Sequence, residues 1–149
     1  MNQKLIIEKN FNLALENHQK NNFQIAERIY KKILKINPNH FQSICFLGTL
    51  SIQTKNFERA KQLFYKAIEI QPNNANVHNN LGTLFKELRE FQKAINHFQR
   101  AIEIQPNQAD AHYNLGIVFK ELKEFQKAIS CYQKVIQINP NYVDAHNNL

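Results

Sequence analysis

Glycine and proline are scarce in this sequence. Only 3 Gly and 4 Pro occur among 149 residues, which is about 5% of the chain where ordinary usage gives about 12%. An all-β sandwich or barrel needs frequent turn residues, so the composition argues against that class. Apolar residues make up 43% of the chain, which also argues against a disordered segment.

Cysteine and long apolar runs are scarce as well. Cys45 and Cys131 have neither a CxxC spacing nor a Cys/His ligand spacing, so we expect free thiols, no disulfide framework and no metal site. No apolar run is long enough to span a bilayer, and charges interrupt residues 1–11, which therefore lack the apolar core of a secretory signal. We expect no membrane partner and a cytoplasmic location, with the nucleus as the alternative.

The charge and the motifs point away from nucleic acid and catalysis. Lys and Arg number 19 against 12 Asp and Glu, and the resulting +7 is modest for a nucleic-acid binder. The sequence contains no Gly-rich phosphate loop, nucleophile elbow or HExxH motif. We expect a protein that is not an enzyme, has no cofactor and binds no nucleic acid.

The few glycines and prolines all belong to one periodic system. Successive prolines lie 34 residues apart, and so do successive glycines. The prolines are Pro38, Pro72, Pro106 and Pro140, and the glycines are Gly48, Gly82 and Gly116. A fixed period of this length is typical of a stacked helical repeat rather than of one closed core.

Alignment on the prolines divides the chain into four repeats and the start of a fifth, which form a single array. The repeats are 7–40, 41–74, 75–108, 109–142 and the partial repeat 143–149. Each repeat has two amphipathic segments, and the second begins at a Phe such as Phe57. The polar links between the segments are so short that each pair must form an antiparallel hairpin. We expect the hairpins to stack through their glycine and alanine columns.

The 34-residue period, with its Leu-Gly, Ala, aromatic and Pro columns, resembles the tetratricopeptide repeat family over essentially the whole chain. The resemblance implies an all-α, right-handed superhelical solenoid in which the first helices of the repeats line a concave groove for proteins or peptides. Residues Ala111–Gly116, AHYNLG, also resemble repeats of O-GlcNAc transferase. Ile33, Val135 and Ala14 depart from the small-residue columns, which suggests less regular packing in the terminal repeats.

An asparagine recurs just before the Leu of the first helix, at a position that the family geometry directs into the groove. These asparagines are Asn12, Asn80, Asn114 and Asn148, and the second repeat has Phe46 instead. An amide side chain both donates and accepts, so a row of them can hold the backbone of an extended peptide. The alternative is that the asparagines only follow the common family pattern.

The rest of the predicted groove is neutral and partly apolar. Its other candidate binding residues are Phe46, Thr49, Thr83, Lys86, Tyr113, Ile117 and Lys120. The family's clamp for a terminal carboxylate is not matched, because Asp110 stands where a cation is required. We therefore expect a non-catalytic scaffold that binds an extended, partly hydrophobic segment of a protein.

Histidines and basic residues also recur. We interpret His78, His112 and His146 as packing residues, since equivalent positions in stacked repeats are too far apart to share a metal. His18, His40 and His97 form no spaced pair. Another set lies on one face of the second helix: Arg28, Lys31, Lys32 and Lys35. This face is either solvated, with a Glu27–Lys31 pair, or a surface for acidic partners.

Two further hypotheses concern the protein beyond this array. The array could be the substrate-recruiting arm of a larger enzyme, such as an O-GlcNAc transferase-like glycosyltransferase. The chain stops inside the fifth first helix, so apolar surface on the last complete helix stays open to another copy. We therefore expect end-to-end self-association.

Overall fold

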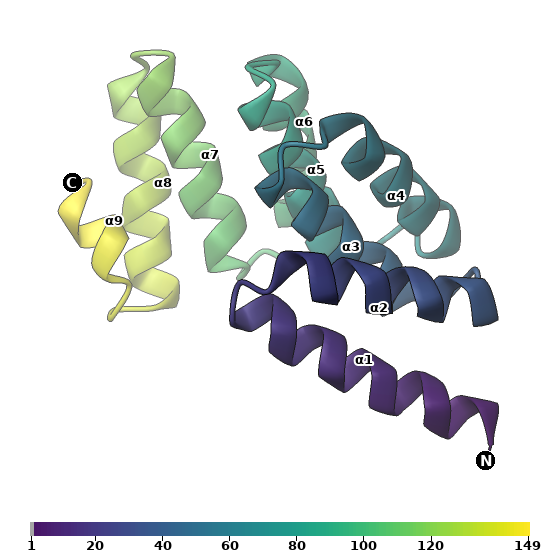
Figure 1. Ribbon diagram of the computed structural model, residues 1–149. Helices are drawn as coiled ribbons and strands as arrows, with labels where there is room; N and C mark the ends of the chain where they lie inside the picture. The colour runs from purple at the N-terminus through teal and green to yellow at the C-terminus, as the bar shows by residue number, and fades with distance from the viewer. Residues whose placement is uncertain (1) are drawn as a thin grey trace. The chain divides into compact units, whose positions relative to one another are not determined.

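The computed structural model describes residues 2–149, and within that range it contains nine α-helices and no strand (Figure 1), which confirms the predicted all-α class. The helices are α1 (Gln3–Gln19), α2 (Phe23–Ile36), α3 (Phe41–Gln53), α4 (Phe57–Ile70), α5 (Ala75–Glu87), α6 (Phe91–Ile104), α7 (Ala109–Glu121), α8 (Phe125–Ile138) and α9 (Val143–Asn147). The odd-numbered helices are the first helices of the repeats, and α2, α4, α6 and α8 are the second.

The chain divides into two compact units, residues 1–72 and 73–149. Unit 1 contains the hairpins α1–α2 and α3–α4, and unit 2 contains α5–α6, α7–α8 and the short α9. In each unit one hairpin packs on the next, through α2 and α3 in unit 1 and through α6 and α7 in unit 2. Each unit therefore shows the stacked antiparallel helix pairs expected of a solenoid.

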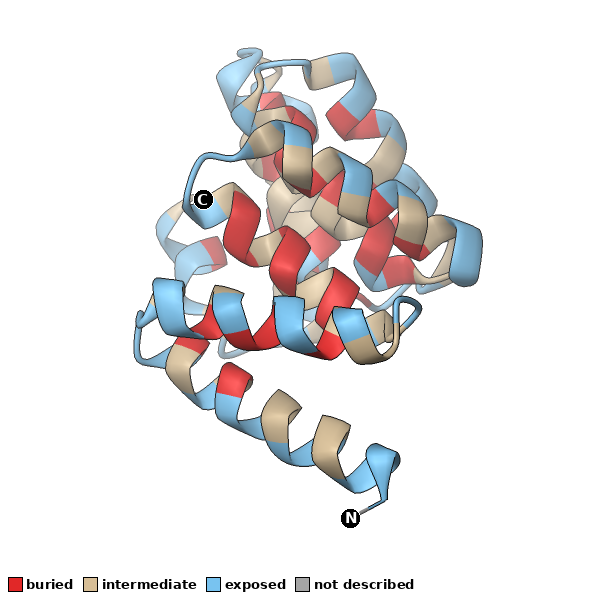
Figure 2. Ribbon diagram, turned by 45° about the vertical axis from the view of Figure 1, so that its right-hand side comes forward, coloured by how far each residue is buried: buried red, intermediate tan, exposed pale blue. Residues whose placement is uncertain are grey.

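The buried residues lie on the faces where the helices meet (Figure 2). Each second helix buries two side chains that recur in every repeat, an alanine and, four residues later, an aromatic ring. The alanines are Ala26, Ala60, Ala94 and Ala128, and the rings are Tyr30, Phe64, Phe98 and Tyr132. This spacing produces one apolar stripe along each second helix, which is the condition for packing against its partner.

The turn within each hairpin has one residue in the left-handed region. Asn21, Lys55, Arg89 and Lys123 have φ values of 60°, 58°, 59° and 61°. The backbone N–H of the next residue then reaches back five residues, as in the bond of 2.7 Å from Asn56 to the Ser51 carbonyl. The left-handed residue thus satisfies carbonyls at the end of each first helix.

The glycine column does not connect neighbouring hairpins, so that part of the prediction was wrong. A Cβ added to Gly48, Gly82 or Gly116 would lie 2.7, 2.5 or 2.7 Å from a ring carbon of the aromatic residue in the same hairpin. For Gly82 that residue is Phe98, which is completely buried. Glycine therefore allows the ring of the second helix to lie against the backbone of the first.

Small residues do connect hairpins, although in unit 2 the clustered alanines are not those of the Ala26, Ala60, Ala94 and Ala128 column. In unit 2 a buried cluster joins Ala75 of α5, Ala101 of α6 and Ala111 of α7, with Ile102 and Ile104 packed against it. The corresponding cluster of unit 1 includes residues of α1, α2 and α3. Small side chains let the helices of successive repeats approach closely, and the apolar side chains around them fill the remaining space.

Candidate functional site

Most of the predicted groove residues lie in unit 2, on α5, on α7 and at Asn148, which caps the end of α9. On α5, Asn80, Thr83 and Lys86 follow one another at intervals of three residues, so they share one helix face. On α7, Asn114, Ile117 and Lys120 repeat this spacing. All of these side chains are half-buried except that of Lys120, which is exposed. Each of the two helices therefore presents a polar, accessible row.

Side-chain hydrogen bonds connect these rows from one repeat to the next. The Asn114 amide donates to Oδ1 of Asn79 at 3.2 Å, and the Asn148 amide donates to the Tyr113 hydroxyl at 3.4 Å. The two pairs are equivalent, since each joins residues 35 apart on successive first helices. Lys120 Nζ also donates to Oδ1 of Asn148, at 2.8 Å.

A second recurrent contact joins residues that are 32 apart. The Gln108 amide donates to Oδ1 of Asn76 at 2.6 Å, and the Tyr142 hydroxyl donates to Oδ1 of Asp110 at 2.9 Å. Burial, and then the bond to Asp110, raise the pKa of Tyr142. The sequence analysis missed these pairs, although their two members recur at the 34-residue period.

Tyr113 provides the aromatic part of this surface. Its ring centroid lies 5.2 Å from that of Tyr142 and 5.8 Å from that of Tyr132, so both neighbours hold it in place. Tyr113 itself is half-buried. A held ring beside amide groups can contact an apolar side chain while the amides bind a backbone.

The three predicted residues of unit 1 do not form such a row. Phe46 packs among the rings of Phe11 and Tyr30, with centroid distances of 5.6 and 6.3 Å. The Thr49 hydroxyl donates to the Cys45 carbonyl of its own helix at 3.2 Å, and Asn12 is exposed. Phe46 is therefore mainly a core residue, and here the asparagine column has only the exposed Asn12.

Unit 1 instead has a hollow between α1 and the start of α3 that was not predicted. Its volume is about 650 Å³, and its lining is partly apolar and partly charged. The lining residues are Gln3, Lys4, Ile7, Glu8, Phe11, Asn37, His40 and Gln42. Burial lowers the pKa of His40, whose ring lies against the edge of Phe11 at 5.5 Å.

The histidine prediction was partly wrong. His78 is buried, but its Nδ1 lies 3.3 Å from Nδ1 of His97, a pair that the sequence analysis did not identify. His112 and His146 are instead hydrogen-bonded through Nε2 to the carbonyls of Pro106 and Pro140, each at 2.8 Å. His146 is exposed, so it does not fill the space between helices as we had expected.

The two cysteines are free thiols, as predicted. Burial raises the pKa of both Cys45 and Cys131 to about 11, so neither provides the thiolate that nucleophilic catalysis requires. Residues 2–149 contain no group of three His, Cys, Asp or Glu side chains placed to hold a metal. In the same range no helix has the length and apolar character needed to cross a membrane.

Comparison with known families assigns nearly the whole chain. Models described as the tetratricopeptide repeat match residues 10–40, 41–74 and 109–142. Overlapping matches at 63–96 and 85–123, described as a tetratricopeptide repeat and a TPR repeat, fill the interval. Among curated proteins none matches.

Solved structures show the same fold. One crystal structure of MamA is 32% identical, with a TM-score of 0.76 over 91% of this chain and 79% of that chain. A second MamA structure is 30% identical, with a TM-score of 0.77 over 95% and 78%. A structure of pilF from Pseudomonas aeruginosa reaches a TM-score of 0.88 over 98% and 67%, and its 22% identity supports the fold alone.

Proposed function

Because the chain belongs to the tetratricopeptide repeat family, whose members are generally non-catalytic interaction scaffolds, we propose that it binds an extended segment of a partner protein. The binding surface is the face of α5, α7 and α9 in unit 2. Asn80, Asn114 and Asn148 hold the peptide backbone, and Tyr113 with Ile117 contacts an apolar side chain.

The observation that supports this proposal is that two of the three amides in unit 2 are hydrogen-bonded to the preceding first helix. Asn114 and Asn148 are each held by a partner one repeat back, at 3.2 and 3.4 Å. An amide has two donor hydrogens and an acceptor oxygen with two lone pairs, so the single bond of Asn114 leaves most of its capacity for a ligand. Asn148 also donates to the Asp144 carbonyl and accepts from Lys120, so it keeps one acceptor lone pair for a ligand. Because neighbouring groups orient these amides, less side-chain entropy is lost when a peptide binds.

The test is a pull-down from cell extract with mass spectrometry, which compares the wild type with the double substitution N80A/N114A. The double variant should bind partners of this surface about thirtyfold more weakly and so recover much less of them, since two lost amide bonds at about 1 kcal/mol each sum to about 2 kcal/mol. Circular dichroism should show unchanged helicity, because both side chains are only half-buried. A control replaces two exposed residues outside the surface, Q126A/Q133A on α8.

Two results would contradict the proposal. One is an unchanged set of partners in N80A/N114A, and the other is equal depletion in Q126A/Q133A. The resemblance of residues 111–116 to O-GlcNAc transferase repeats supports a second candidate, a substrate-recruiting arm of a larger enzyme. This second candidate function uses the same surface. It predicts that the gene continues into a catalytic domain, which transcript sequencing would reveal.

A further inference from the structure

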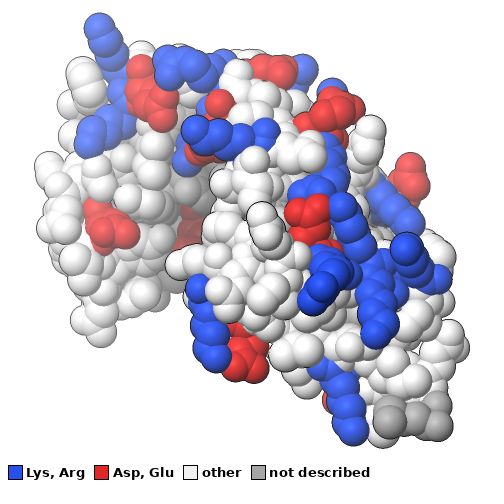
Figure 3. Space-filling model, in the orientation of Figure 1, with Lys and Arg blue, Asp and Glu red and all other residues white. Residues whose placement is uncertain are grey.

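The positive charge of this protein is concentrated in unit 1. Unit 1 has eleven Lys and Arg against five Asp and Glu, a net charge of +6, whereas unit 2 has eight against seven and a net charge of +1. Figure 3 shows a group of blue Lys and Arg atoms over the helices of unit 1, which Figure 1 labels α1 to α4. The charge that attracts acidic partners therefore belongs to one unit.

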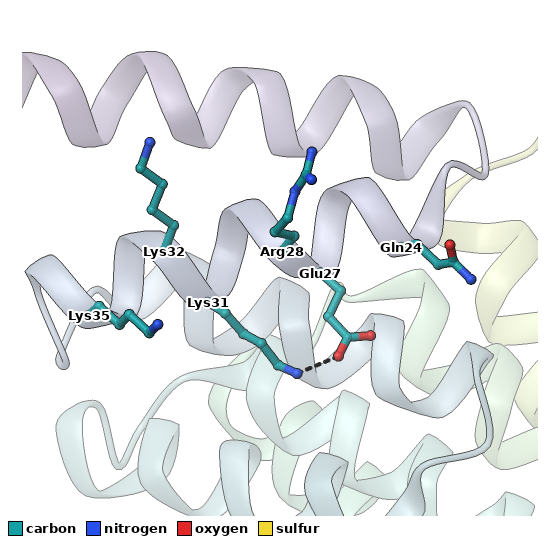
Figure 4. A pocket seen from close by; sticks show the side chains of 6 residues that line it. All are labelled: Gln24, Glu27, Arg28, Lys31, Lys32 and Lys35. Atoms are coloured by element: carbon teal, nitrogen blue, oxygen red, sulfur yellow. Dashed lines mark ion pairs between the residues drawn. The ribbon is translucent and has the colours of Figure 1, made fainter.

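Helix α2 carries the densest group of these charges. Arg28, Lys31, Lys32 and Lys35 are all exposed and extend over eight residues, or about 10 Å of helix. Together with Gln24 and Glu27 they line an open hollow of about 630 Å³ (Figure 4). We call these four cations the α2 basic stripe.

The one acidic residue in this hollow is already neutralised. Oε1 of Glu27 lies 2.5 Å from Nη1 of Arg59 and 2.6 Å from Nζ of Lys31. The hydrogen bonds from Arg59 and Lys31 hold the pKa of Glu27 below its ordinary value, so it stays ionised. Within residues 2–149, Arg28, Lys32 and Lys35 form no ion pair. Their charge is available to a partner.

The other repeats show which of these cations the fold requires. At the four positions of the stripe, each other second helix has only one cation. The equivalents are Gln62, Tyr65, Lys66 and Glu69 in α4, Asn96, Gln99, Arg100 and Glu103 in α6, and Ser130, Gln133, Lys134 and Gln137 in α8.

The shared cation has a structural contact in two repeats. Lys66 donates to the Pro38 carbonyl at 2.6 Å, and Arg100 donates to Oδ1 of Asn73 at 3.1 Å. Both acceptors precede the first helix of the same repeat. The fold thus accounts for a cation at the position of Lys32, and Arg28, Lys31 and Lys35 are additional.

We propose that the α2 basic stripe is a docking surface for an acidic segment of a partner protein, rich in Asp or Glu. This surface lies outside the amide row of unit 2 and does not depend on the function proposed for that row. Several carboxylates on one peptide match the three unpaired cations Arg28, Lys32 and Lys35, and the positive field of the whole stripe speeds association.

The lining of the hollow favours an acidic protein over other anionic partners. No aromatic side chain lines it, whereas single-stranded nucleic acids bind where bases stack on rings. No apolar side chain lines it either, and membrane-surface helices insert an apolar face beside their basic residues. The long, flexible Lys side chains suit carboxylates at varied spacing.

The experiment measures binding of a fluorescein-labelled oligoglutamate peptide by fluorescence anisotropy, with the full chain. The key variant, R28Q/K31Q/K35Q, gives α2 the neutral character that α8 has at these positions. We expect it to bind oligoglutamate about tenfold more weakly, since the ion pairs of Arg28 and Lys35 with the peptide and the positive charge of Lys31 are lost. Wild-type binding should also weaken when salt rises from about 0.05 M to about 0.3 M.

A matched control separates the stripe from net charge. K123Q/K127Q/K134Q removes three cations from unit 2 and has the same net charge as the key variant, so it should bind oligoglutamate as the wild type does. Transplantation is a second check. Adding S130R/Q133K/Q137K to the key variant builds the stripe on α8 around Lys134 and should restore binding.

Several results would overturn the proposal. One is the absence of oligoglutamate binding by the wild type, and another is equal weakening in the key variant and the control. A third is stripe-dependent binding of a DNA oligonucleotide or of phosphatidylserine vesicles that is tighter than binding of oligoglutamate, because it would assign the surface to a different partner. Binding of oligoglutamine as tightly as oligoglutamate would show that carboxylates are not recognised.

Discussion

At the scale of single residues, the recurrent glycines Gly48, Gly82 and Gly116 determine how closely the two helices of each hairpin can pack. Gly82 lies on α5, where alanine would normally stabilise the helix by about 1 kcal/mol. A Cβ at this position would lie 2.5 Å from ring carbons of Phe98, which has no exposed surface through which to move away. An alanine at this position would therefore gain helix propensity but overlap the Phe98 ring. The overlap decides whether the free energy of unfolding rises or falls.

We predict that Gly82→Ala lowers the free energy of unfolding by about 1 to 3 kcal/mol, the usual cost of overpacking a filled site. Urea denaturation followed by circular dichroism would measure it. Glu87→Ala, at an exposed position of the same helix, should change stability by less than about 0.5 kcal/mol. A Gly82→Ala protein as stable as the wild type would show that the ring is not confined.

The partner of each glycine could not be predicted from the sequence. The 34-residue period identified Gly48, Gly82 and Gly116 as equivalent and predicted close approach of another helix. Periodicity shows which residues share a helix face, but it does not show which neighbour fills that face. Whether the ring comes from the same hairpin or the next depends on how the helices are rotated, which only the structure shows.

The same limit applies to the asparagines. Their recurrence before the Leu of each first helix predicted a shared face, and in unit 2 Asn114 and Asn148 do lie on successive first helices with equivalent contacts. Their hydrogen-bond partners, Asn79 and Tyr113, immediately precede members of the predicted groove. A ligand for this row stays a prediction, because amides hold a backbone without selecting a sequence.

At the scale of helices, a pair formed by the buried His78 and the half-buried His97 joins α5 to α6. The rings of His78 and His97 are stacked, with centroids 5.5 Å apart. The His97 ring also stacks on the ring of Phe85, with centroids 5.4 Å apart. Burial, and then the charge of His78, lower the pKa of His97 from 6.5 to about 4. The folded protein therefore keeps His97 neutral at pH values where the unfolded chain is protonated.

This difference predicts a loss of stability in acid. As pH falls from about 6.5 to about 4, His97 is protonated in the unfolded state but stays neutral in the folded state, so the free energy of unfolding decreases. We expect a loss of about 1 to 2 kcal/mol, allowing for the half-burial of His97. Urea midpoints at about pH 7.5 and about pH 5 would measure it.

The substitution His97→Leu, which introduces the residue that repeat 2 has at this position, should flatten this pH dependence. His146→Gln is the control, since that side chain is exposed. If wild type and His97→Leu lose equal stability between the two pH values, another group causes the acid sensitivity. The pair was not predicted because its members lie 19 residues apart on different helices, outside any helical spacing.

The hairpin turns show a further limit at this scale. Short polar links predicted where the chain reverses, and the helices begin and end there. The left-handed residue in each turn could not be predicted, because three of the four are Lys55, Arg89 and Lys123 rather than the usual Gly or Asn. A left-handed backbone conformation at a Lys or Arg cannot be recognised from a single sequence, because these residue types do not favour that conformation.

At the scale of the whole molecule, helix α1 differs from helices α8 and α9 in how readily its surface can pack against another copy of the chain. Residues at two columns of the first helices are buried in the later repeats but charged in α1. Lys9 stands at the column of Ser43, Val77, Ala111 and Ala145, and Glu16 at that of Leu50, Leu84 and Val118. Both α1 side chains are exposed. Charges at these columns oppose stacking of α1 onto a second helix of another copy.

The C-terminal helices expose large apolar side chains more fully than α1 exposes Leu5 and Leu13. Phe125 of α8 is 57% exposed, whereas its equivalents Phe23, Phe57 and Phe91 are half-buried. Val143 of α9 is 67% exposed. An apolar end that cannot pair with the charged α1 face can pair with its own copy, and such a contact between identical surfaces closes at two subunits.

We therefore predict a monomer–dimer equilibrium rather than a growing filament, and F125E/V143K should shift it toward the monomer. Multi-angle light scattering over a range of concentrations would measure the mass, with L5E/L13K, which alters exposed residues of α1, as the control. Species larger than a dimer, or dissociation caused by L5E/L13K, would mean that α1 takes part after all. In that case the charges at Lys9 and Glu16 do not cap the array, and the contact would join unlike ends.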